Sequence, residues 1–276
     1  MPRHVTPSVA AELLDRHRLR AGRRYGQHFL VDPNTVARIV RLADVSPDET
    51  ILEVGPGLGS LTVALASAAR RVVAVELDET VADALREVLD DANNVDLIVA
   101  DALHADLPAL VGGTARLVAN LPYNVATPVL MRVLDDSPQI SGGLVMVQRE
   151  LGERWTASPG TRAYGAVTLH VSYYADAAIV GDVPKSVFMP PPKVASVLVS
   201  FRRHARPPVD VDDPILFVRF VHKAFAHRRK TLRNSLAAAG FPVSVLEDAL
   251  NTTGIDARAR PEEIDLETFA DLYRRL

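Results

Sequence analysis

The sequence predicts an α/β fold with a parallel sheet, followed by a smaller all-helical domain. Short β-branched runs recur from residue 50 to about 150, and helix-like segments separate them, as in sheets with helices on both faces. Beyond residue 203 the pattern is helical to the end. Ligands of such sheets bind at the carboxyl ends of the strands, so functional residues are expected there.

The elements follow in order along the chain. Asp32 and Pro33 can cap and open a first helix over residues 33–43. Strands are expected at 50–55, 71–76, 95–101, 116–120 and 143–148. Helices are expected between them, for example at 59–69 and, with Asp78 as its cap, at 78–91. Two closing strands, 176–183 and 195–201, flank a proline-rich loop, and residues 202–213 are typical of a linker.

Composition excludes several classes of protein. Cysteine is absent, which excludes disulfides, thiolate metal sites and cysteine nucleophiles. No apolar run reaches the roughly 18 residues of a membrane span, so a cytoplasmic protein without membrane contact is expected. The formal net charge of −3 argues against a protein that coats nucleic acid through bulk charge.

A glycine-rich loop follows the first strand of the sheet. Gly55, Gly57 and Gly59 let the backbone turn sharply and approach a ligand, and Glu76 at the end of the next strand can accept both hydroxyl hydrogens of a ribose. The alternative is a simple tight turn. Dinucleotide sites are usually spaced G-x-G-x-x-G, whereas this loop is G-x-G-x-G, a spacing that resembles the S-adenosylmethionine loop.

Two further strand ends carry polar groups. Asp101 can accept from the exocyclic amine of a cofactor's adenine, or it can cap the next helix. The following strand ends in "NLPY". The side-chain oxygen of Asn120 and the carbonyl of Leu121 can accept the hydrogens of a base's exocyclic amine and so expose its lone pair.

In this interpretation Pro122 fixes the turn and Tyr123 offers a face on which a flipped base stacks. The alternative is a turn that ends a strand, with the tyrosine in the core. Because methylation of a pyrimidine carbon needs a thiolate and the chain has no cysteine, amine or oxygen acceptors remain.

With these motifs the chain resembles the ribosomal RNA adenine dimethyltransferases of the small-subunit type. The resemblance covers nearly the whole chain and rests on "YGQHFLVD", "LEVGPGLGSLT", "NLPYNVATPVL", "VFMPPPKVASVLV", "AHRRKTLRNSL" and "TGIDARARPEEI". It implies a Rossmann-like class I S-adenosylmethionine-dependent methyltransferase sheet. The expected division is a basic N-terminal extension (1–24), a methyltransferase domain (25–203) and a helical RNA-binding domain (204–276).

The resemblance also implies the residues of the site. The cofactor pocket would be lined by Gln27, His28, Leu30, Gly55, Glu76, Leu77, Asp101, Ala102 and Asn120, in addition to Gly57 and Gly59 of the loop. The family usually has Asn where this chain has His28. The change is harmless if the family contact uses backbone atoms, and it alters local affinity if the contact uses the amide. Phe188, in the proline-rich loop, is either a second wall for the flipped adenine or a buried core residue.

The implied reaction is repeated methylation of N6 on two adjacent adenosines in a hairpin loop near the 3′ end of small-subunit (16S) rRNA, by direct in-line transfer without a metal. The implied substrate is rRNA within a pre-ribosomal 30S particle, and the enzyme would be a monomer. Three alternatives remain: a large-subunit rRNA adenine methyltransferase of the macrolide-resistance type, a non-catalytic ribosome-assembly factor on the same fold and, least favoured by the glycine spacing, a nicotinamide oxidoreductase.

Basic residues predict an RNA-binding surface outside the sheet. Arg23 and Arg24 lie near the start, and a helix opened by Asp213-Pro214 would place Arg219, Lys223, His227, Lys230 and Asn234 on one side. Arg228, Arg229 and Arg233 would widen the patch. A solvated helix face is the alternative, but nine Lys/Arg against three Asp between residues 200 and 235 favour phosphate contact.

Overall fold

The computed structural model describes residues 5–19, 28–227 and 229–276. It divides into two compact units. The first comprises the chain up to Gly152 together with Ala178–Arg202, and the second comprises Glu153–Ala177 with Arg203–Leu276. The helical unit therefore contains residues 153–177 as well as the C-terminal region, whereas the sequence placed that segment with the sheet.

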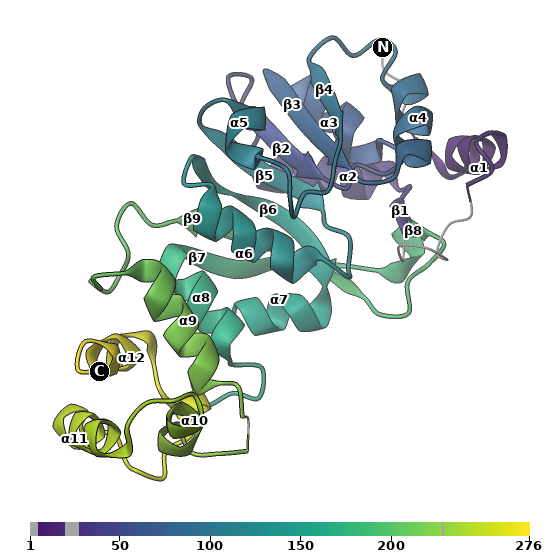
Figure 1. The fold of residues 1–276 in the computed structure, drawn as a ribbon. Coiled ribbons are helices and arrows are strands. Elements are labelled where there is room, and N and C mark those ends of the chain that lie inside the picture. Colours follow the sequence, from purple (N-terminus) through teal and green to yellow (C-terminus); the bar gives the residue numbers. More distant parts are fainter. Residues whose placement is uncertain (1–4, 20–27, 228) are drawn as a thin grey trace. The chain divides into compact units, whose positions relative to one another are not determined.

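The first unit is built on a seven-stranded sheet with the strand order β4-β3-β2-β5-β6-β9-β7 (Figure 1). β2 to β6 run parallel to their neighbours, and β9 is antiparallel to β6. The five expected strands and the two closing strands are confirmed as β2 (Thr50–Val54), β3 (Arg71–Glu76), β4 (Val95–Val99), β5 (Ala115–Asn120), β6 (Ile140–Gln148), β7 (Ala175–Val183) and β9 (Ser196–Arg203).

Strand order fixes where a ligand can bind. The chain passes from β2 outward to β3 and β4 and then returns to β5 on the other side of β2. At this reversal the connections after β2 and β5 diverge, which opens a crevice at the carboxyl ends of these strands. The glycine loop and the "NLPY" turn are the segments that leave β2 and β5 at this point.

Helices flank the sheet, with α5 and α6 in front of it in Figure 1 and α2 and α3 behind. The Asp32 carboxylate caps α2 by accepting from the Thr35 N–H at 2.8 Å, and Asp78 caps α4 in the same way, as expected. The helices of this part are α1 (Pro7–Arg16), α2 (Pro33–Ala43), α3 (Ser60–Ala68), α4 (Glu79–Val88), α5 (Leu107–Val111) and α6 (Ala126–Asp136). The division between the two units falls within α7 (Arg149–Trp155).

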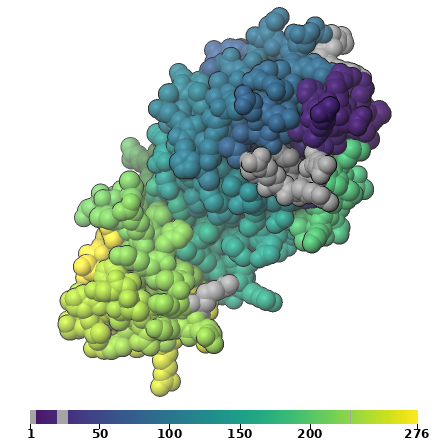
Figure 2. Space-filling view, turned by 45° about the vertical axis from the view of Figure 1, so that its right-hand side comes forward, coloured from purple at the N-terminus to yellow at the C-terminus, as the bar shows by residue number. Residues whose placement is uncertain are grey.

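Two small features complete the first unit. The short strands β1 (Phe29–Leu30) and β8 (Phe188–Met189) pair antiparallel, and the 3-10 turn η1 (Lys185–Val187) precedes β8. Helix α1, which the sequence did not predict, packs through Ala10 and Leu13 in the apolar cluster that contains residues of α4. Figure 2 shows this helix, in deep purple, lying directly against the blue surface.

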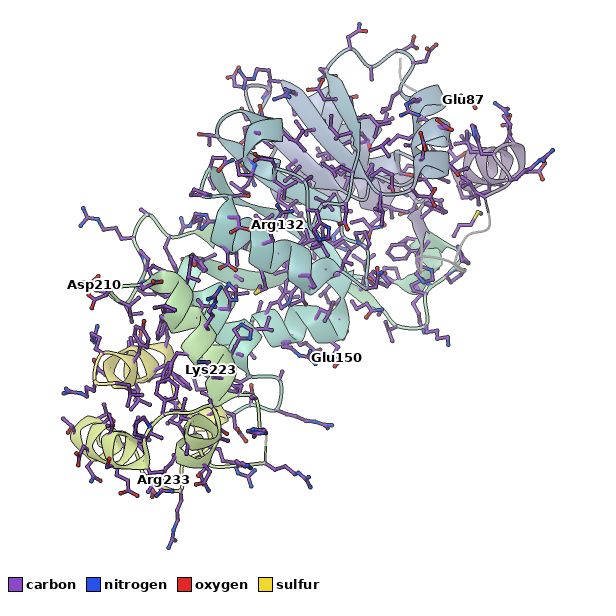
Figure 3. The ribbon with its side chains drawn as sticks, in the orientation of Figure 1. Glu87, Arg132, Glu150, Asp210, Lys223 and Arg233 are labelled. Atoms are coloured by element: carbon purple, nitrogen blue, oxygen red, sulfur yellow. The ribbon has the colours of Figure 1, made fainter. Side chains whose placement is uncertain are left out.

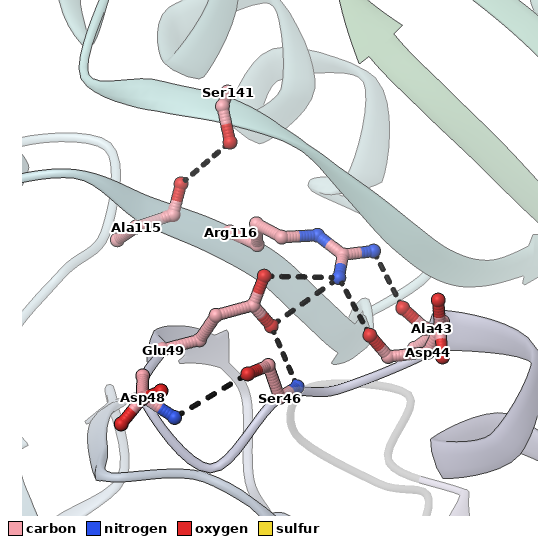
Figure 4. A network of polar contacts seen from close by, with 8 residues as sticks. All are labelled: Ala43, Asp44, Ser46, Asp48, Glu49, Ala115, Arg116 and Ser141. Carbon is pink, nitrogen blue, oxygen red and sulfur yellow. Dashed lines mark hydrogen bonds and ion pairs between the residues drawn. The ribbon is translucent and has the colours of Figure 1, made fainter.

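Arg116 joins the start of β5 to the end of α2 (Figure 4). Its guanidinium donates to the carbonyls of Ala43 and Asp44, at 2.6 and 3.2 Å, and pairs with Glu49 at 3.3 Å. The last carbonyls of a helix have no partner within the helix, so this cation caps α2 where the chain turns at Asp44.

The second unit is a set of helices around an aromatic core. Its helices are α8 (Ala166–Tyr174), α9 (Pro214–Ala224), α10 (Leu232–Ala238), α11 (Val243–Thr253) and α12 (Leu266–Tyr273), with the 3-10 turn η2 (Pro261–Glu263). Phe217, Phe220 and Phe269 are buried at its centre. In the part of the chain that the structure describes, no helix is long and apolar enough to cross a membrane.

The expectation of one helix carrying Arg219 through Asn234 is wrong. α9 ends at Ala224 and α10 begins at Leu232. Thr231 caps α10 with its side chain, and the Leu232 N–H donates to the Ala259 carbonyl at 2.9 Å, so both groups favour a new helix start. Lys230 and Asn234 therefore do not share a helix with Arg219 and Lys223.

Candidate active site

A pocket opens at the carboxyl ends of the central strands of the first unit. The segments that follow β2, β3, β4 and β5 line it together with the segment around β1. It brings together most of the predicted site residues: His28, Leu30, Gly55, Gly57, Glu76, Leu77, Asp101, Ala102, Asn120, Leu121, Pro122 and Tyr123.

The glycine loop packs directly against the "NLPY" turn. Gly55 and Gly57 have φ angles of +72° and +57°, which favour glycine. A Cβ on Gly55 would lie 2.7 Å from Cγ of Pro122, so the loop after β2 approaches the loop after β5 too closely for any side chain. Gly59 does not line the pocket. Its φ of +89° favours glycine at the start of α3, and a Cβ there would lie 2.5 Å from Cδ1 of Leu85 on α4.

Glu76 is buried at the end of β3 and its carboxylate is fixed by backbone groups. It accepts from the N–H groups of Gly57, Leu77 and Asp78 at 3.2, 3.0 and 3.0 Å. Burial raises its pKa, and these hydrogen bonds act in the opposite direction. A carboxylate has about four lone-pair positions and three are used here, so Glu76 retains about one, on Oε2, for a ligand's hydroxyl group.

Asp101 lies in the turn after β4. It accepts from the Leu103 N–H at 2.8 Å and contacts Nδ1 of His104 at 2.9 Å, and both contacts lower its pKa. Arg132 of α6, labelled in Figure 3, donates to the carbonyls of Ala102 and Ala105, both at 2.7 Å. Asp101 does not cap the next helix, as the alternative interpretation expected, because Asp106 is the cap of α5 and accepts from the Ala109 N–H at 3.0 Å. The bond from the Leu103 N–H instead holds the Asp101 carboxylate at the pocket wall.

Asn120 carries an unusual polar atom. Its Nδ2 donates to the His28 carbonyl at 3.5 Å, while its Oδ1 is buried and has no hydrogen-bond partner among the described residues. An unpaired buried acceptor costs about 1–3 kcal/mol, so such atoms are rare unless a ligand satisfies them. This contact uses the backbone of residue 28, and an Asn in place of His28 would present the same carbonyl.

Tyr123 is held on two sides. Its hydroxyl and that of Ser196 share a hydrogen bond of 2.6 Å, and the half-buried phenol has a pKa raised by burial. The ring centroid lies 5.6 Å from that of His28, with the planes inclined by 34°. The His28 ring is in turn fixed by Nδ1, which donates to the Pro190 carbonyl at 2.7 Å.

Phe188 lies in the core and not at the pocket. Its side chain is 3% exposed and packs in a cluster with Leu30 and Val187. The buried alternative is thus the one that the structure supports. The aromatic ring next to Tyr123 is His28, which sequence reasoning considered only for the cofactor.

The pocket also contains residues that sequence reasoning missed. Glu53, at the end of β2, is almost fully buried, and burial raises its pKa to about 8. Its Oε2 has no partner among the described residues. Its position two residues before Gly55, the first glycine of the loop, was a signal that could have identified it. Phe29 and Val125 also line the pocket, and no feature of the sequence distinguished them.

The remaining predicted residues lie elsewhere. Gln27, Arg23, Arg24 and Arg228 fall outside the described residues. Arg219, Lys223, Arg229 and Lys230 are exposed on the second unit, and Arg233 pairs with Glu247. Figure 3 labels Lys223 and Arg233, and the Lys223 ammonium lies 5.6 Å from the ring centroid of Phe241. In the described ranges no group of three or more metal-ligating side chains was found.

The strand order, the glycine loop, the buried Glu76 and the "NLPY" turn together define a class I methyltransferase. Residues 18–276 match the family model described as ribosomal RNA adenine dimethylase, and the chain belongs to this family. The match spans the sheet and the whole helical unit, so membership does not rest on the pocket alone.

Relatives and solved structures agree with this assignment. The chain is 42% identical to the ribosomal RNA small subunit methyltransferase A of Moorella thermoacetica, over 99% of this chain and 98% of that one. It is 43% identical to the protein of the same name from Thermobifida fusca, over 97% and 94%.

Two solved structures share the fold. The 23S rRNA methyltransferase ErmE is 29% identical, with a TM-score of 0.69 over 90% of this chain and 99% of that one. A dimethyladenosine transferase from Plasmodium falciparum is 23% identical, with a TM-score of 0.72 over 89% and 96%. The latter likeness concerns the fold alone, and together they confirm the expected class I methyltransferase sheet.

Proposed function

We propose that the protein transfers methyl groups from S-adenosylmethionine to N6 of two adjacent adenosines in a hairpin loop near the 3′ end of small-subunit rRNA. The product would be N6,N6-dimethyladenosine, formed during ribosome biogenesis. The observation that carries this proposal is the buried, unpaired Oδ1 of Asn120 beside the Tyr123 ring. The family membership and the full-length relatives named as small subunit methyltransferases support it.

The pocket residues fit S-adenosylmethionine. Gly55 and Gly57 bring the backbone to the pocket wall, Glu76 retains about one lone-pair position for a ribose hydroxyl, and Asp101 remains anionic to accept from the adenine amine. Leu30, Leu77 and Ala102 supply apolar surface at the same wall. The bound cofactor supplies a methyl group on a sulfonium, which is already a good leaving group.

The task of the chain is therefore to position and desolvate the acceptor amine. Tyr123 offers a face to a flipped adenine, and Pro122 fixes the turn against Gly55. Oδ1 of Asn120 and the carbonyl of Leu121 accept the two amine hydrogens, which directs the nitrogen lone pair outward. An acceptor placed in advance in a buried site costs no reorganisation when the reaction occurs.

The exposed cations of the second unit are proposed to contact RNA phosphates. Arg219 and Lys223 lie on α9, and Arg229 and Lys230 lie between α9 and α10. The proposed substrate is rRNA in a pre-ribosomal 30S particle, on which the protein acts as a monomer in the cytoplasm. The ion pair of Arg233 with Glu247 is exposed and weak enough to exchange for a phosphate contact.

A second candidate is methylation of large-subunit rRNA, which the likeness to the 23S rRNA methyltransferase favours. The relatives with higher identity over nearly the full chain are small-subunit enzymes, and this supports the first proposal. A non-catalytic assembly factor is disfavoured because the acceptor oxygen and the Tyr123 ring are both present in the pocket.

The test is incubation of the protein with S-adenosylmethionine and either unmodified small subunits or large subunits. Modified nucleosides are then identified by mass spectrometry and mapped by primer extension. Dimethyladenosine at two neighbouring loop adenines of the small subunit is expected. Modification only of the large subunit supports the second candidate, and binding of cofactor and small subunit without modification supports the assembly factor.

A further inference from the structure

The Tyr123 ring lies in an irregular loop, and its orientation depends on side-chain contacts. The loop connects β5, which ends at Asn120, to α6, which begins at Ala126. Within the described residues, the Tyr123 hydroxyl bonds to Ser196 and the ring lies beside His28. Outside helices and strands, the regular backbone hydrogen bonds that help to orient side chains are missing. We therefore take these side-chain contacts to set the angle of the ring.

Ser196 is suited to this role because it is rigid and buried. It is the first residue of β9, it is 0% exposed, and it pairs with Gln148 of β6 in the sheet register. A buried hydroxyl needs a hydrogen-bond partner, and the Tyr123 hydroxyl at 2.6 Å supplies it. The bond therefore ties the hydroxyl end of the Tyr123 side chain to the seven-stranded sheet.

We propose that Ser196 is a positioning residue for methyl transfer: its hydroxyl holds the Tyr123 ring at the angle that places a stacked adenine against Asn120. This inference rests on the proposed function, in which Tyr123 carries the base. Ser196 is not among the residues that line the pocket, so it acts through Tyr123 and not on the substrate. Its loss lets the ring tilt and misaligns the amine, whereas the walls formed by Gly55, Glu76 and Asp101 remain.

The test is a double-mutant cycle with Ser196→Ala, Tyr123→Phe and the double variant, each as the full-length protein acting on unmodified small subunits. Each single change is expected to lower kcat by about three- to tenfold, the equivalent of one hydrogen bond. The double variant is expected to be no slower than either single variant, because both remove the same bond. The dissociation constant for S-adenosylmethionine and the KM for the subunit should stay within about twofold.

Ser200→Ala is the matched control, since Ser200 lies on the same strand and its hydroxyl donates to the Ala178 carbonyl at 3.4 Å, away from Tyr123. It should leave kcat unchanged. A merely structural role of Ser196 would lower cofactor affinity and stability together and would not couple to Tyr123. If the effects of the two single changes multiply, or if Ser196→Ala turns over like the wild type, the proposal is overturned.

Two further outcomes separate this inference from the proposed function. Tyr123→Ala removes the stacking face, so wild-type turnover in that variant contradicts the stacking role itself. Inactivity of Tyr123→Ala with wild-type kcat in Tyr123→Phe contradicts only the role of Ser196. If Ser196→Ala does not fold, Tyr123→Phe still removes the same hydrogen bond from the other side. A lowered kcat of Tyr123→Phe then supports the role of Ser196, and a wild-type kcat contradicts it.

Discussion

The Asn120 side chain is proposed to serve the reaction at a cost to the stability of the unliganded protein. Its buried Oδ1 has no partner among the described residues, which costs free energy in the unliganded protein. Asn120→Ala should therefore lower kcat by about 10²- to 10³-fold, the effect of losing one preorganised polar group. Its free energy of unfolding should stay equal or rise, because an unsatisfied acceptor is removed.

The measurement combines methyl transfer to small subunits, titration with S-adenosylmethionine and urea unfolding. Asn93→Ala is the control, because Asn93 is exposed and is absent from this pocket. Wild-type turnover in Asn120→Ala would exclude the proposed mechanism. A lower free energy of unfolding would show instead that the side chain as a whole is stabilising, through its Nδ2 bond to the His28 carbonyl or through a partner of Oδ1 in solution.

Glu53 predicts a pH dependence of stability. Burial raises its pKa from 4.5 to about 8, so the folded chain binds the proton more tightly than the unfolded chain does. The resulting stabilisation is complete below the unfolded pKa and is lost as the pH rises through the folded pKa. Glu53→Gln cannot ionise, so its free energy of unfolding relative to wild type should increase between pH 5 and 8, by up to about 1.4 kcal/mol per pH unit.

Urea unfolding of both proteins at several pH values checks this prediction. The comparison isolates Glu53, because every other titrating group is shared by the two proteins. A difference that does not change with pH would mean that the Glu53 carboxyl is hydrated in the folded state.

At the scale of elements, the contact between the two pocket loops is the feature that sequence motifs alone do not reveal. Gly55→Ala introduces a Cβ at 2.7 Å from Pro122 and also strains a backbone with φ of +72°. Gly112→Ala is a matched control, because Gly112 has φ of +68° and nothing within 4 Å of its Cβ position. Gly112→Ala should cost about 1–2 kcal/mol of conformational strain, and Gly55→Ala should cost more.

Gly55→Ala should lower the methylation rate as well as the free energy of unfolding, because the displaced Pro122 lies between Leu121 and Tyr123. Urea unfolding gives the two free energies, and single-turnover methylation gives the rates. Equal destabilisation by the two substitutions, with no loss of rate, would show that the loops separate at no cost.

Elements also show how far the sequence could predict this structure. The strands of the sheet were predictable because each is an apolar run bounded by turn residues. The starts of α2 and α4 were predictable because Asp32 and Asp78 are typical N-cap residues. The break after α9 was not predicted, because the helical spacing of cations continues through it. Its cause includes the Leu232 bond to Ala259, a contact between residues far apart in sequence. The position of Phe188 could not be decided from the sequence either, because its packing in the core involves Leu30, which is also far away along the chain.

For the whole molecule, the formal net charge of −3 conceals a separation of charge. Nine Lys/Arg against three Asp lie between residues 200 and 235, so the remainder of the chain is correspondingly acidic. The helical unit that carries this segment also contains residues 153–177. The composition of residues 153–177 does not differ from that of the sheet region, so the sequence gives no signal that they belong to the helical unit. Their membership depends on which residues they pack against in the folded chain.

This charge separation predicts how RNA binding responds to salt. If exposed cations of the helical unit contact phosphates, affinity for small-subunit RNA must fall as salt rises, because each contact releases condensed counterions.

Lys223→Gln and Arg229→Gln should each reduce the slope of log K against log salt by about 0.7–0.9, and the double variant by about twice that. Arg86→Gln, on α4 of the first unit and paired with Asp83, should leave the slope unchanged. Filter binding at several salt concentrations measures the slopes of the wild type and the four variants. A response to salt that is flat in the wild type, or equally steep in every variant, would remove these residues from the RNA interface.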